Sequence, residues 1–113
     1  MKRRFRLTRS TDFKRVRRLG KSYAHPLIVL VTLPNKTGHL QIGVTASQAV
    51  GHAVQRNRVR RRIKACFDEL IPDIHPGWDL VAVARRPIVE AEYSEIRIGV
   101  ARLLKQAGLM VER

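Results

Sequence analysis

Hydrophobic side chains recur with the period of a helix near both ends of the chain. Near the start, Phe13 and Val16 lie on one side of a polar segment, with Ser10 as a suitable N-cap and Gly20 as a suitable end. We therefore predict a short helix over 10–19. Near the other end we predict a helix over 94–107 that stops at Gly108, with these side chains turned inward: Ile98, Ala101 and Leu104 or Leu103.

A longer helix is predicted in the middle of the chain, over 53–69. Its apolar residues fall three and four positions apart and form one stripe that can pack on a sheet. The other positions are mostly arginine. The stripe consists of Val59, Ile63, Cys66, Phe67 and Leu70.

Strand composition appears in three segments between these helices. Residues 26–33, 39–47 and 78–84 are rich in β-branched and aliphatic side chains and predict three strands. Residues 21–24 are a candidate for a fourth, short strand. Because residues 34–38 have turn composition, we predict that the first two long strands pair antiparallel across this turn.

The order of the predicted elements is α-β-β-α-β-α, with the candidate strand after the first helix. A helix that joins two strands suggests a βαβ unit, and the predicted hairpin makes the sheet mixed. The patterns therefore predict an α+β fold, in which helices pack on a mixed sheet as one sandwich domain spanning residues 1–113. Residues 1–9 are predicted to be an extended basic arm that is flexible until an anionic partner binds.

The charge of the chain is large and unevenly distributed. The 23 Lys and Arg against 9 Asp and Glu give a net charge of +14. Residues 1–67 carry +16 with Asp12 as their single acid, whereas residues 68–113 carry −2. Such polarity favours a polyanion as the partner over a soluble basic protein with a solvated face, because ordinary surfaces mix both signs.

The composition disfavours a secreted or membrane protein. The basic residues at the start are not followed by an apolar stretch, and the most apolar run, 27–33, is too short to span a bilayer. A basic amphipathic helix could lie on an anionic membrane, but the predicted strands favour a packed globule. Cys66 has no second cysteine to pair with, which favours a cytoplasmic location.

The polar side of the 53–69 helix is the strongest candidate site. Solvated helix faces usually pair Lys or Arg with Glu four residues away, but no acid occurs between Asp12 and Asp68. Phosphates would offset the repulsion between these like charges, and the guanidinium fork binds phosphate oxygens in pairs. We predict a nucleic-acid-binding face, with a solubility face as the alternative. It is formed by Arg58, Arg60, Arg61, Arg62 and Lys64, with Arg56 at the edge of the apolar stripe.

Folded RNA is favoured over DNA as the partner. Helices that read a DNA groove usually belong to helix-turn-helix or zinc-finger modules, and neither fits a helix packed on strands beside a lone cysteine. A basic ridge on a sheet with helices suits a folded RNA that is recognised by shape and phosphates. We therefore expect no DNA partner.

No cluster of residues predicts an active site within the protein. A nuclease needs clustered carboxylates or a His pair, but the acids are scattered, and those that open the last helix complement its dipole. Cys66 falls on the apolar stripe and is interpreted as a small buried hydrophobe. We predict no metal site, because these histidines have no ligand spacing with one another or with Cys66: His25, His39, His52 and His75.

Residues 43–47 (GVTAS) and 51–61 (GHAVQRNRVRR) resemble the signature of a known family. The centre of that signature is Arg-Asn-Arg, here residues 56–58, followed by further basic residues. By these residues the chain resembles the bacterial ribonuclease P protein subunit. Further matches, in order and spacing, extend the resemblance over nearly the whole chain: Arg6-Leu7, Asp12-Phe13, Val16, Gly20 and Ala84-Arg85-Arg86-Pro87.

The resemblance implies a subunit that joins a large catalytic RNA to remove the 5′ leader of precursor tRNA by phosphodiester hydrolysis. In that family the RNA carries out the chemistry with bound magnesium. The protein stabilises the RNA and holds the leader between its first helix and its sheet. The family fold has a left-handed βαβ crossover, against the general rule. A ribosomal or ribosome-assembly RNA-binding protein is the alternative, but it does not account for Arg-Asn-Arg together with Phe13 and residues 84–87.

The resemblance also assigns roles by position. Asn57 would bind phosphate or 2′-hydroxyl groups, or fix the backbone of the crossover. Phe13 would line the leader cleft, anchor the core, or do both, and Arg85 and Arg86 would extend the RNA surface or be solvated. The expected contacts with the catalytic RNA are Arg56, Asn57, Arg58, Arg60, Arg61, Arg62 and Lys64. The expected leader cleft comprises Phe13, Arg17, Val31, Thr45 and Ser47, with weaker RNA contacts from Arg6, Arg9, Arg85 and Arg86.

Several positions depart from the family pattern. Arg17 and Val31 stand where aromatic residues are frequent, so we expect the leader to be bound by charge and aliphatic contact more than by stacking on rings. Gln48 and Ala49 replace a usual basic pair. His52 stands where Asn is common, so we expect a poorer N-cap for the basic helix.

Overall fold

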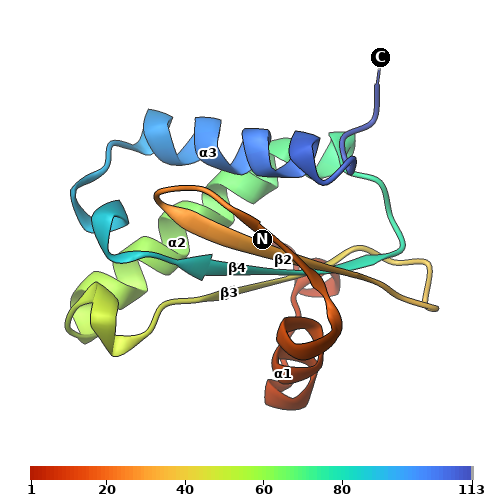
Figure 1. Cartoon of the computed structure of the whole chain (residues 1–113), viewed down its shortest axis with the longest axis horizontal. Helices are drawn as coiled ribbons and strands as arrows, with labels where there is room; N and C mark the ends of the chain where they lie inside the picture. Colours follow the sequence, from red (N-terminus) through yellow and green to blue (C-terminus); the bar gives the residue numbers. More distant parts are fainter. Residues whose placement is uncertain (113) are drawn as a thin grey trace.

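The computed structural model describes residues 1–112 and contains one four-stranded sheet with helices on both faces (Figure 1). The predicted α+β sandwich is confirmed, as is the short strand at 21–24; Arg113, within the predicted domain range, lies outside the described residues. The strands are β1 (Lys21–Ala24), β2 (Ile28–Pro34), β3 (Gln41–Thr45) and β4 (Trp78–Ala84). The helices are α1 (Ser10–Leu19), α2 (Ala53–Leu70) and α3 (Tyr93–Gln106), with short 3-10 turns η1 (Arg3–Phe5), η2 (Gln48–Val50), η3 (Ile71–Asp73) and η4 (Arg86–Glu90).

Strand β4 separates the two strands that the sequence predicts to pair. The sheet order is β1-β2-β4-β3, with β4 antiparallel to β2 and parallel to β3. Leu80, Val81 and Ala82 are all fully buried, so β4 is apolar on both faces and occupies the interior of the sheet. The predicted hairpin between β2 and β3 is therefore wrong, although the sheet is mixed as expected.

Helix α2 joins the parallel strands β3 and β4 and completes the predicted βαβ unit. In Figure 1 both strands run from right to left, α2 passes behind them, and the chain steps from the lower β3 to the upper β4. A connection with this geometry is left-handed, as the resemblance implies, whereas almost all such connections are right-handed.

The two faces of the sheet carry cores of unequal size. Helices α2 and α3 cover one face, and the predicted stripe of α2 is confirmed because all five of its residues are buried there. On the opposite face α1 covers a much smaller cluster, which consists of Leu7, Val16, Val31 and Val81.

Helix α3 packs on the core through Leu103 and Leu104, as predicted, with Ala101 partly buried against it, but one predicted residue is misplaced. Ile98 is 50% exposed, so its predicted inward position is wrong. The connection between β1 and β2 packs on α3 at Gly99, where a Cβ atom would lie 2.8 Å from the His25 ring. This close approach selects the buried side of α3, formed by Ile96, Gly99, Val100, Leu103 and Leu104.

The first nine residues do not form the extended arm that the sequence predicts. They contain the turn η1, and Leu7 is buried in the small core. The Leu7 amide donates a hydrogen bond to the Ile42 carbonyl at 2.9 Å, so this segment lies along the outer edge of β3. Helix α1 begins at Ser10 itself, with Arg9 rather than Ser10 as its N-cap.

Candidate nucleic-acid interface

Helix α2 presents a cationic surface, which we call the α2 basic face, mostly along its N-terminal half. Arg58 and Arg61 are exposed, and the remaining members are partly exposed. Within residues 1–112 none of them forms an ion pair with an acid. The positive end of the helix dipole lies at the same end of α2 and adds to the potential. The face consists of Arg56, Arg58, Arg60, Arg61 and Lys64.

The acids of α2 lie in its last turn and are engaged elsewhere. Asp68 pairs with the amino group of Met1 at 3.0 Å. Glu69 accepts hydrogen bonds from Arg97 and from the Tyr93 hydroxyl, and the Arg97 contact, followed by the Tyr93 contact, holds the pKa of Glu69 below its usual value. The acids therefore do not neutralise the α2 basic face.

Arg62 and Asn57 are oriented by contacts within the protein. The sequence predicts that Arg62 points outward with its neighbours. Instead, Arg62 donates a hydrogen bond through Nη2 to the Ala91 carbonyl at 2.9 Å and supports the segment before α3. Asn57 is exposed, and its side-chain oxygen accepts a hydrogen bond from Arg60. This bond orders the two side chains along one side of α2.

The start of α2 is well capped, contrary to the expectation from His52. The His52 Nδ1 atom accepts a hydrogen bond from the Gln55 amide at 3.4 Å, and the Gln55 side chain accepts one from the His52 amide at 3.1 Å. This reciprocal pair is a capping box. The prediction of a poorer cap is wrong because an imidazole with an unprotonated Nδ1 can accept the bond that Asn would accept.

On the opposite face of the sheet, Phe13 packs directly over Gly43. A Cβ atom at Gly43 would lie 2.5 Å from two atoms of the Phe13 ring, so this approach requires glycine. Phe13 is partly buried and packs against the small core beneath α1. It therefore anchors the core, and its partial exposure leaves part of the ring accessible at the edge of the helix.

Strand register divides this face of the sheet into three rows, because alternate residues of a strand share a face. The middle row, Val31, Val81 and Gly43, lies under α1. The next row, which we call the uncovered strip, is partly exposed because α1 does not reach it. The strip consists of Val29, Val83 and Thr45.

The leader-cleft residues predicted from the sequence fall into different positions on this face. Thr45 lies in the uncovered strip, and Arg17 is exposed on α1. Val31 is expected on an open wall of the cleft, but it is only 4% exposed and lies in the row beneath α1. Ser47 is exposed, and its hydroxyl accepts a hydrogen bond from the Ala49 amide at 3.3 Å, so it also caps η2.

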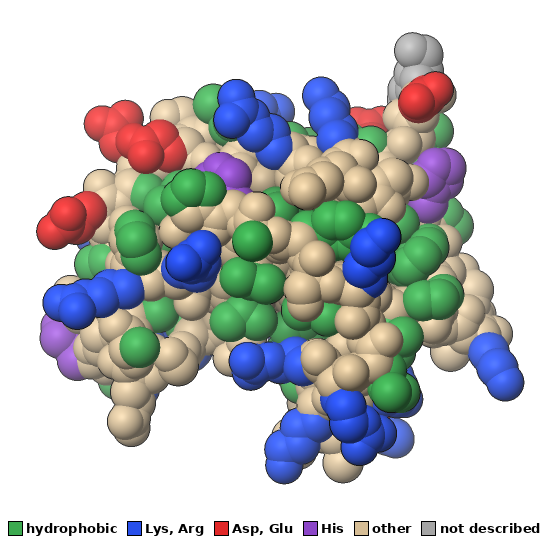
Figure 2. Space-filling view, in the orientation of Figure 1, with side chains coloured by type: hydrophobic (Ala, Val, Ile, Leu, Met, Phe, Trp, Pro, Cys, Tyr) green, Lys and Arg blue, Asp and Glu red, His purple; other side chains and the backbone are tan. Residues whose placement is uncertain are grey.

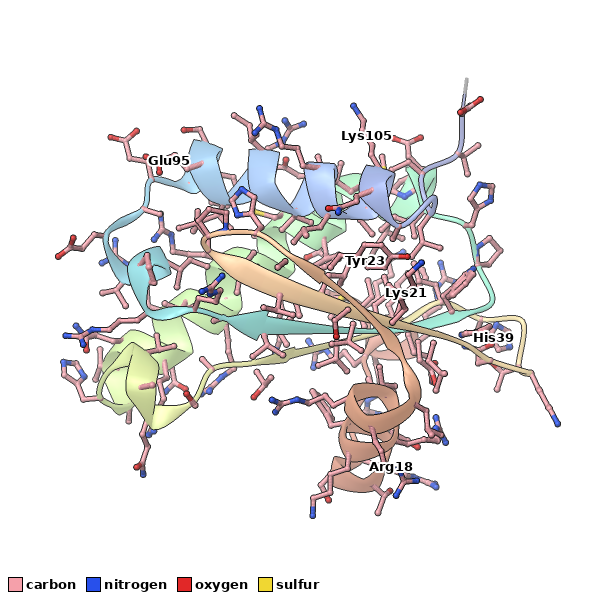
Figure 3. The ribbon with its side chains drawn as sticks, in the orientation of Figure 1. Arg18, Lys21, Tyr23, His39, Glu95 and Lys105 are labelled. Carbon is pink, nitrogen blue, oxygen red and sulfur yellow. The ribbon has the colours of Figure 1, made fainter. Side chains whose placement is uncertain are left out.

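Basic side chains also surround α1 (Figure 2). Arg9 is exposed at the start of the helix, and Arg18 extends from it away from the sheet (Figure 3). Arg6 is exposed and donates a hydrogen bond to the Met1 carbonyl at 3.0 Å. Arg85 and Arg86 follow β4 and are both exposed; the Arg85 guanidinium donates to the His25 carbonyl at 3.2 Å. The molecule thus carries cations on both sides of its sheet.

Sequence reasoning missed a buried acid at the start of β4. Asp79 is 1% exposed, and its two carboxylate oxygens accept hydrogen bonds from Arg15 and Asn35, each at 2.9 Å. Arg15 also pairs with Asp12 at 3.2 Å. The alternation of polar and apolar residues gave no signal, because a single Asp at a strand end usually faces water.

Tyr93 and Cys66 lie together where α2 packs on α3. Burial, followed by the contact with Cys66, raises the pKa of Tyr93, so its hydroxyl stays protonated and donates to Glu69 at 3.1 Å. Burial also raises the pKa of the Cys66 thiol. A buried neutral thiol fits the predicted role of Cys66 as a small hydrophobe.

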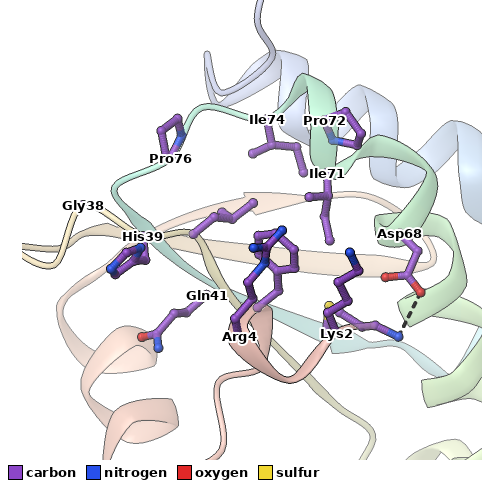
Figure 4. Close-up of a pocket in the computed structure, with 13 residues that line it drawn as sticks. Lys2, Arg4, Gly38, His39, Gln41, Asp68, Ile71, Pro72, Ile74 and Pro76 are labelled. Atoms are coloured by element: carbon purple, nitrogen blue, oxygen red, sulfur yellow. Dashed lines mark ion pairs between the residues drawn. The ribbon is translucent and has the colours of Figure 1, made fainter.

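A hollow of about 970 Å³ lies elsewhere, between η1, the start of β3 and the end of α2 (Figure 4). Its lining includes Phe5, Leu40 and Ile71, together with Lys2 and Arg4. None of the predicted RNA-contact residues lines it. Across residues 1–112, no three or more His, Cys, Asp or Glu side chains are grouped to hold a metal ion, and no helix there is long and apolar enough to cross a bilayer.

The family model and the sequence relatives of this chain agree with each other. The family model described as Ribonuclease P matches residues 1–108. The Ribonuclease P protein component of Herpetosiphon aurantiacus is 35% identical over 113 residues, which cover 100% of this chain and 92% of that protein. The protein of the same name from Geobacillus kaustophilus is 36% identical over 109 residues, covering 96% of this chain and 90% of that protein.

Solved structures give the same result. The RNase P protein of Staphylococcus aureus superposes with a TM-score of 0.86 at 29% identity, covering 94% of this chain and 97% of that one. The RNase P protein of Thermotoga maritima in complex with 1-(4-fluorophenyl)-2-thiourea gives a TM-score of 0.81 at 24% identity, covering 88% and 97%; that likeness concerns the fold alone.

Proposed function

The chain belongs to the ribonuclease P protein family, and on this premise we propose that it binds the catalytic RNA of ribonuclease P through α2 and the 5′ leader of precursor tRNA beside α1. As the protein component of ribonuclease P, it acts in the endonucleolytic removal of the leader from precursor tRNA. The alternative of a ribosomal or ribosome-assembly protein is not favoured by the family match.

The α2 basic face is the observation that carries the proposed contact with the catalytic RNA. Its five cationic side chains have no acidic partner within residues 1–112, and the helix beneath them is fixed to the sheet by five buried residues. RNA phosphates can therefore replace the missing counter-charges on a surface that is already ordered.

The uncovered strip carries the proposed contact with the leader. Val29, Val83 and Thr45 form a continuous row across three strands beside α1, with Phe13 and Arg17 on the helix. An extended single strand needs apolar surface for its bases and cations for its phosphates. The row supplies the aliphatic surface and Arg17 supplies charge, which supports a leader contact with little stacking on rings.

We further propose that the RNA subunit carries the chemistry and holds the magnesium. Carboxylates are the protein ligands that magnesium prefers, and the carboxylates within residues 1–112 are either paired with basic groups or not grouped to hold an ion. The protein would lower the magnesium requirement by neutralising phosphates with α2. The bacterial relatives support a location in the bacterial cytoplasm.

Reconstitution tests this function. Purified protein is added to a bacterial ribonuclease P RNA in low magnesium, with precursor tRNA substrates that have a long or a one-nucleotide leader. We expect stimulated cleavage, a lower KM for the long leader, and no cleavage by the protein alone. Failure to stimulate would remove the subunit function, and cleavage by RNA-free protein would overturn the assignment of chemistry to the RNA.

A further inference from the structure

Asp79 is a buried acid within the sheet. Within residues 1–112, Thr32 is the other buried polar residue. A buried carboxylate is costly unless it is paired and hydrogen-bonded, and Asp79 has both kinds of partner: Arg15 and Asn35, each at 2.9 Å. The two partners belong to different parts of the chain, so Asp79 ties separate elements together.

The first partner, Asn35, organises the turn between β2 and β3. Its Nδ2 group also donates to the His39 carbonyl at 2.9 Å, and its Oδ1 atom accepts from the Thr37 hydroxyl and the Gly38 amide. The carboxylate of Asp79 is thereby held in place from the side of the sheet. It offers a fixed point for the second partner, Arg15, on α1.

Helix α1 has few other attachments. It contains one fully buried residue, Val16, whereas α2 contains five buried residues. A ten-residue helix has little stability of its own, so its position depends on the contacts it makes with the sheet. Those contacts include Val16, Phe13 over Gly43, and the Arg15–Asp79 ion pair.

The ion pair and the uncovered strip lie on opposite sides of α1. Asp79 belongs to the third row of this face, with Leu33 and Gln41, and the strip lies beyond the middle row. Around the helix, Arg15 and Arg17 are separated by about 200°, with Val16 between them facing the sheet. Any rotation of α1 about Val16 that frees Arg15 therefore also moves Arg17 and Phe13 relative to the strip.

We propose that the Arg15–Asp79 ion pair is a positioning device that fixes the angle of α1 over the sheet and thereby sets the leader-binding strip. This inference rests on the proposed function, because it assumes that the leader binds between α1 and the uncovered strip. Asp79 does not touch the leader. It acts through Arg15 and the helix.

The substitution Asp79→Asn separates this role from simple electrostatics. It removes a negative charge beside an arginine, so charge alone predicts that RNA binds more tightly. If the ion pair positions α1, its loss should instead weaken binding of the leader. We expect KM for a long-leader precursor to rise about fivefold, which is at the low end of the couplings usual between two sites. The KM for a one-nucleotide leader, kcat and the affinity for the catalytic RNA should stay unchanged.

Variants of Arg15, the exposed partner, test the same contact in case the Asp79 variant does not fold. Arg15→Met should give the same leader-specific rise in KM, and Arg15→Lys should restore part of the leader affinity because it keeps the charge. Arg18→Met is the matched control, since Arg18 is an exposed arginine on the same helix that points away from the sheet. It removes the same charge and should leave the leader dependence as in the wild type.

The double variant Arg15→Met with Asp79→Asn completes the test. If the two residues act as one device, the double variant should be no worse for the long leader than either single variant. Additive losses, or a lower KM for Asp79→Asn, would overturn the inference while leaving the proposed function intact. A wild-type holoenzyme that does not distinguish long from short leaders would instead overturn the proposed leader contact.

Discussion

Helices α1 and α2 both carry dense positive charge, but they are fixed to the sheet in different ways. Helix α2 has 18 residues and buries a stripe of five apolar side chains in the main core. Helix α1 has 10 residues and buries one, Val16. The difference shows that α2 is a rigid support for its arginines, whereas the position of α1 depends on a few specific contacts.

The two helices also differ in how their charges are balanced. The α2 basic face has no acidic partner within residues 1–112, so its charge is available to an anion. On α1, Arg15 is bound by both Asp12 and Asp79. The cations of α2 are therefore free to bind an external anion, whereas at least one cation of α1 holds that helix on the sheet.

The largest expected effect compares the same substitution on the two sides of the sheet. Phe67→Ala removes a fully buried ring beneath α2 and should cost about 3–5 kcal/mol of unfolding free energy. Phe13→Ala should cost clearly less, because part of that ring is already exposed. Urea denaturation of both variants measures the two values, and equal losses would contradict the unequal cores described above.

A second test adds one carbon atom beneath α1. Gly43→Ala places a Cβ atom against the Phe13 ring and should cost about 1–3 kcal/mol through overpacking. Phe13→Leu, which shortens the overlapping side chain, should recover most of that loss in the double variant. Thermal unfolding of the single and double variants checks this, and absence of recovery would show that another neighbour of Gly43 sets the cost.

A third test concerns binding by α2. Arg58→Ala and Arg61→Ala should weaken binding of the catalytic RNA and lower its salt slope by about one for each phosphate that the variant no longer binds. Stability should change by less than about 0.5 kcal/mol because both side chains are exposed. Arg102→Ala, an exposed arginine on α3, serves as the control and should keep the wild-type slope. Unchanged slopes in the α2 variants would mean that these side chains face water in the complex.

The smallest effect is expected at the start of α2. His52→Ala removes half of the capping box and should cost about 1 kcal/mol, whereas His52→Asn should keep the cap and most of the stability. The unfolding midpoints of the two variants give the comparison. Equal losses in both would show that the imidazole contributes through packing rather than through the hydrogen bond to Gln55.

The sequence was most informative where structure depends on neighbours along the chain. The stripe of α2 follows from side chains three and four apart, and β4 has the predicted bounds although Asp79 interrupts its apolar residues. The α2 basic face was likewise visible as a run of arginines without acids. Helix α3 was predicted in place, and Leu103 and Leu104 face the core as expected, but Ile98 was misplaced because apolar residues occur on more than one side of this helix.

By itself, then, the sequence determined the elements, the fold class and the basic face of α2, since local periodicity and composition carry that information, and its motifs carried the resemblance to the family. Only the tertiary structure decided the strand order, the place of residues 1–9, the three rows beneath α1 and the pairing of Arg15 with Asp79. These features join residues that are far apart in the chain. Their outcome depends on which surfaces exclude water together, and no pattern of neighbouring residues encodes that choice.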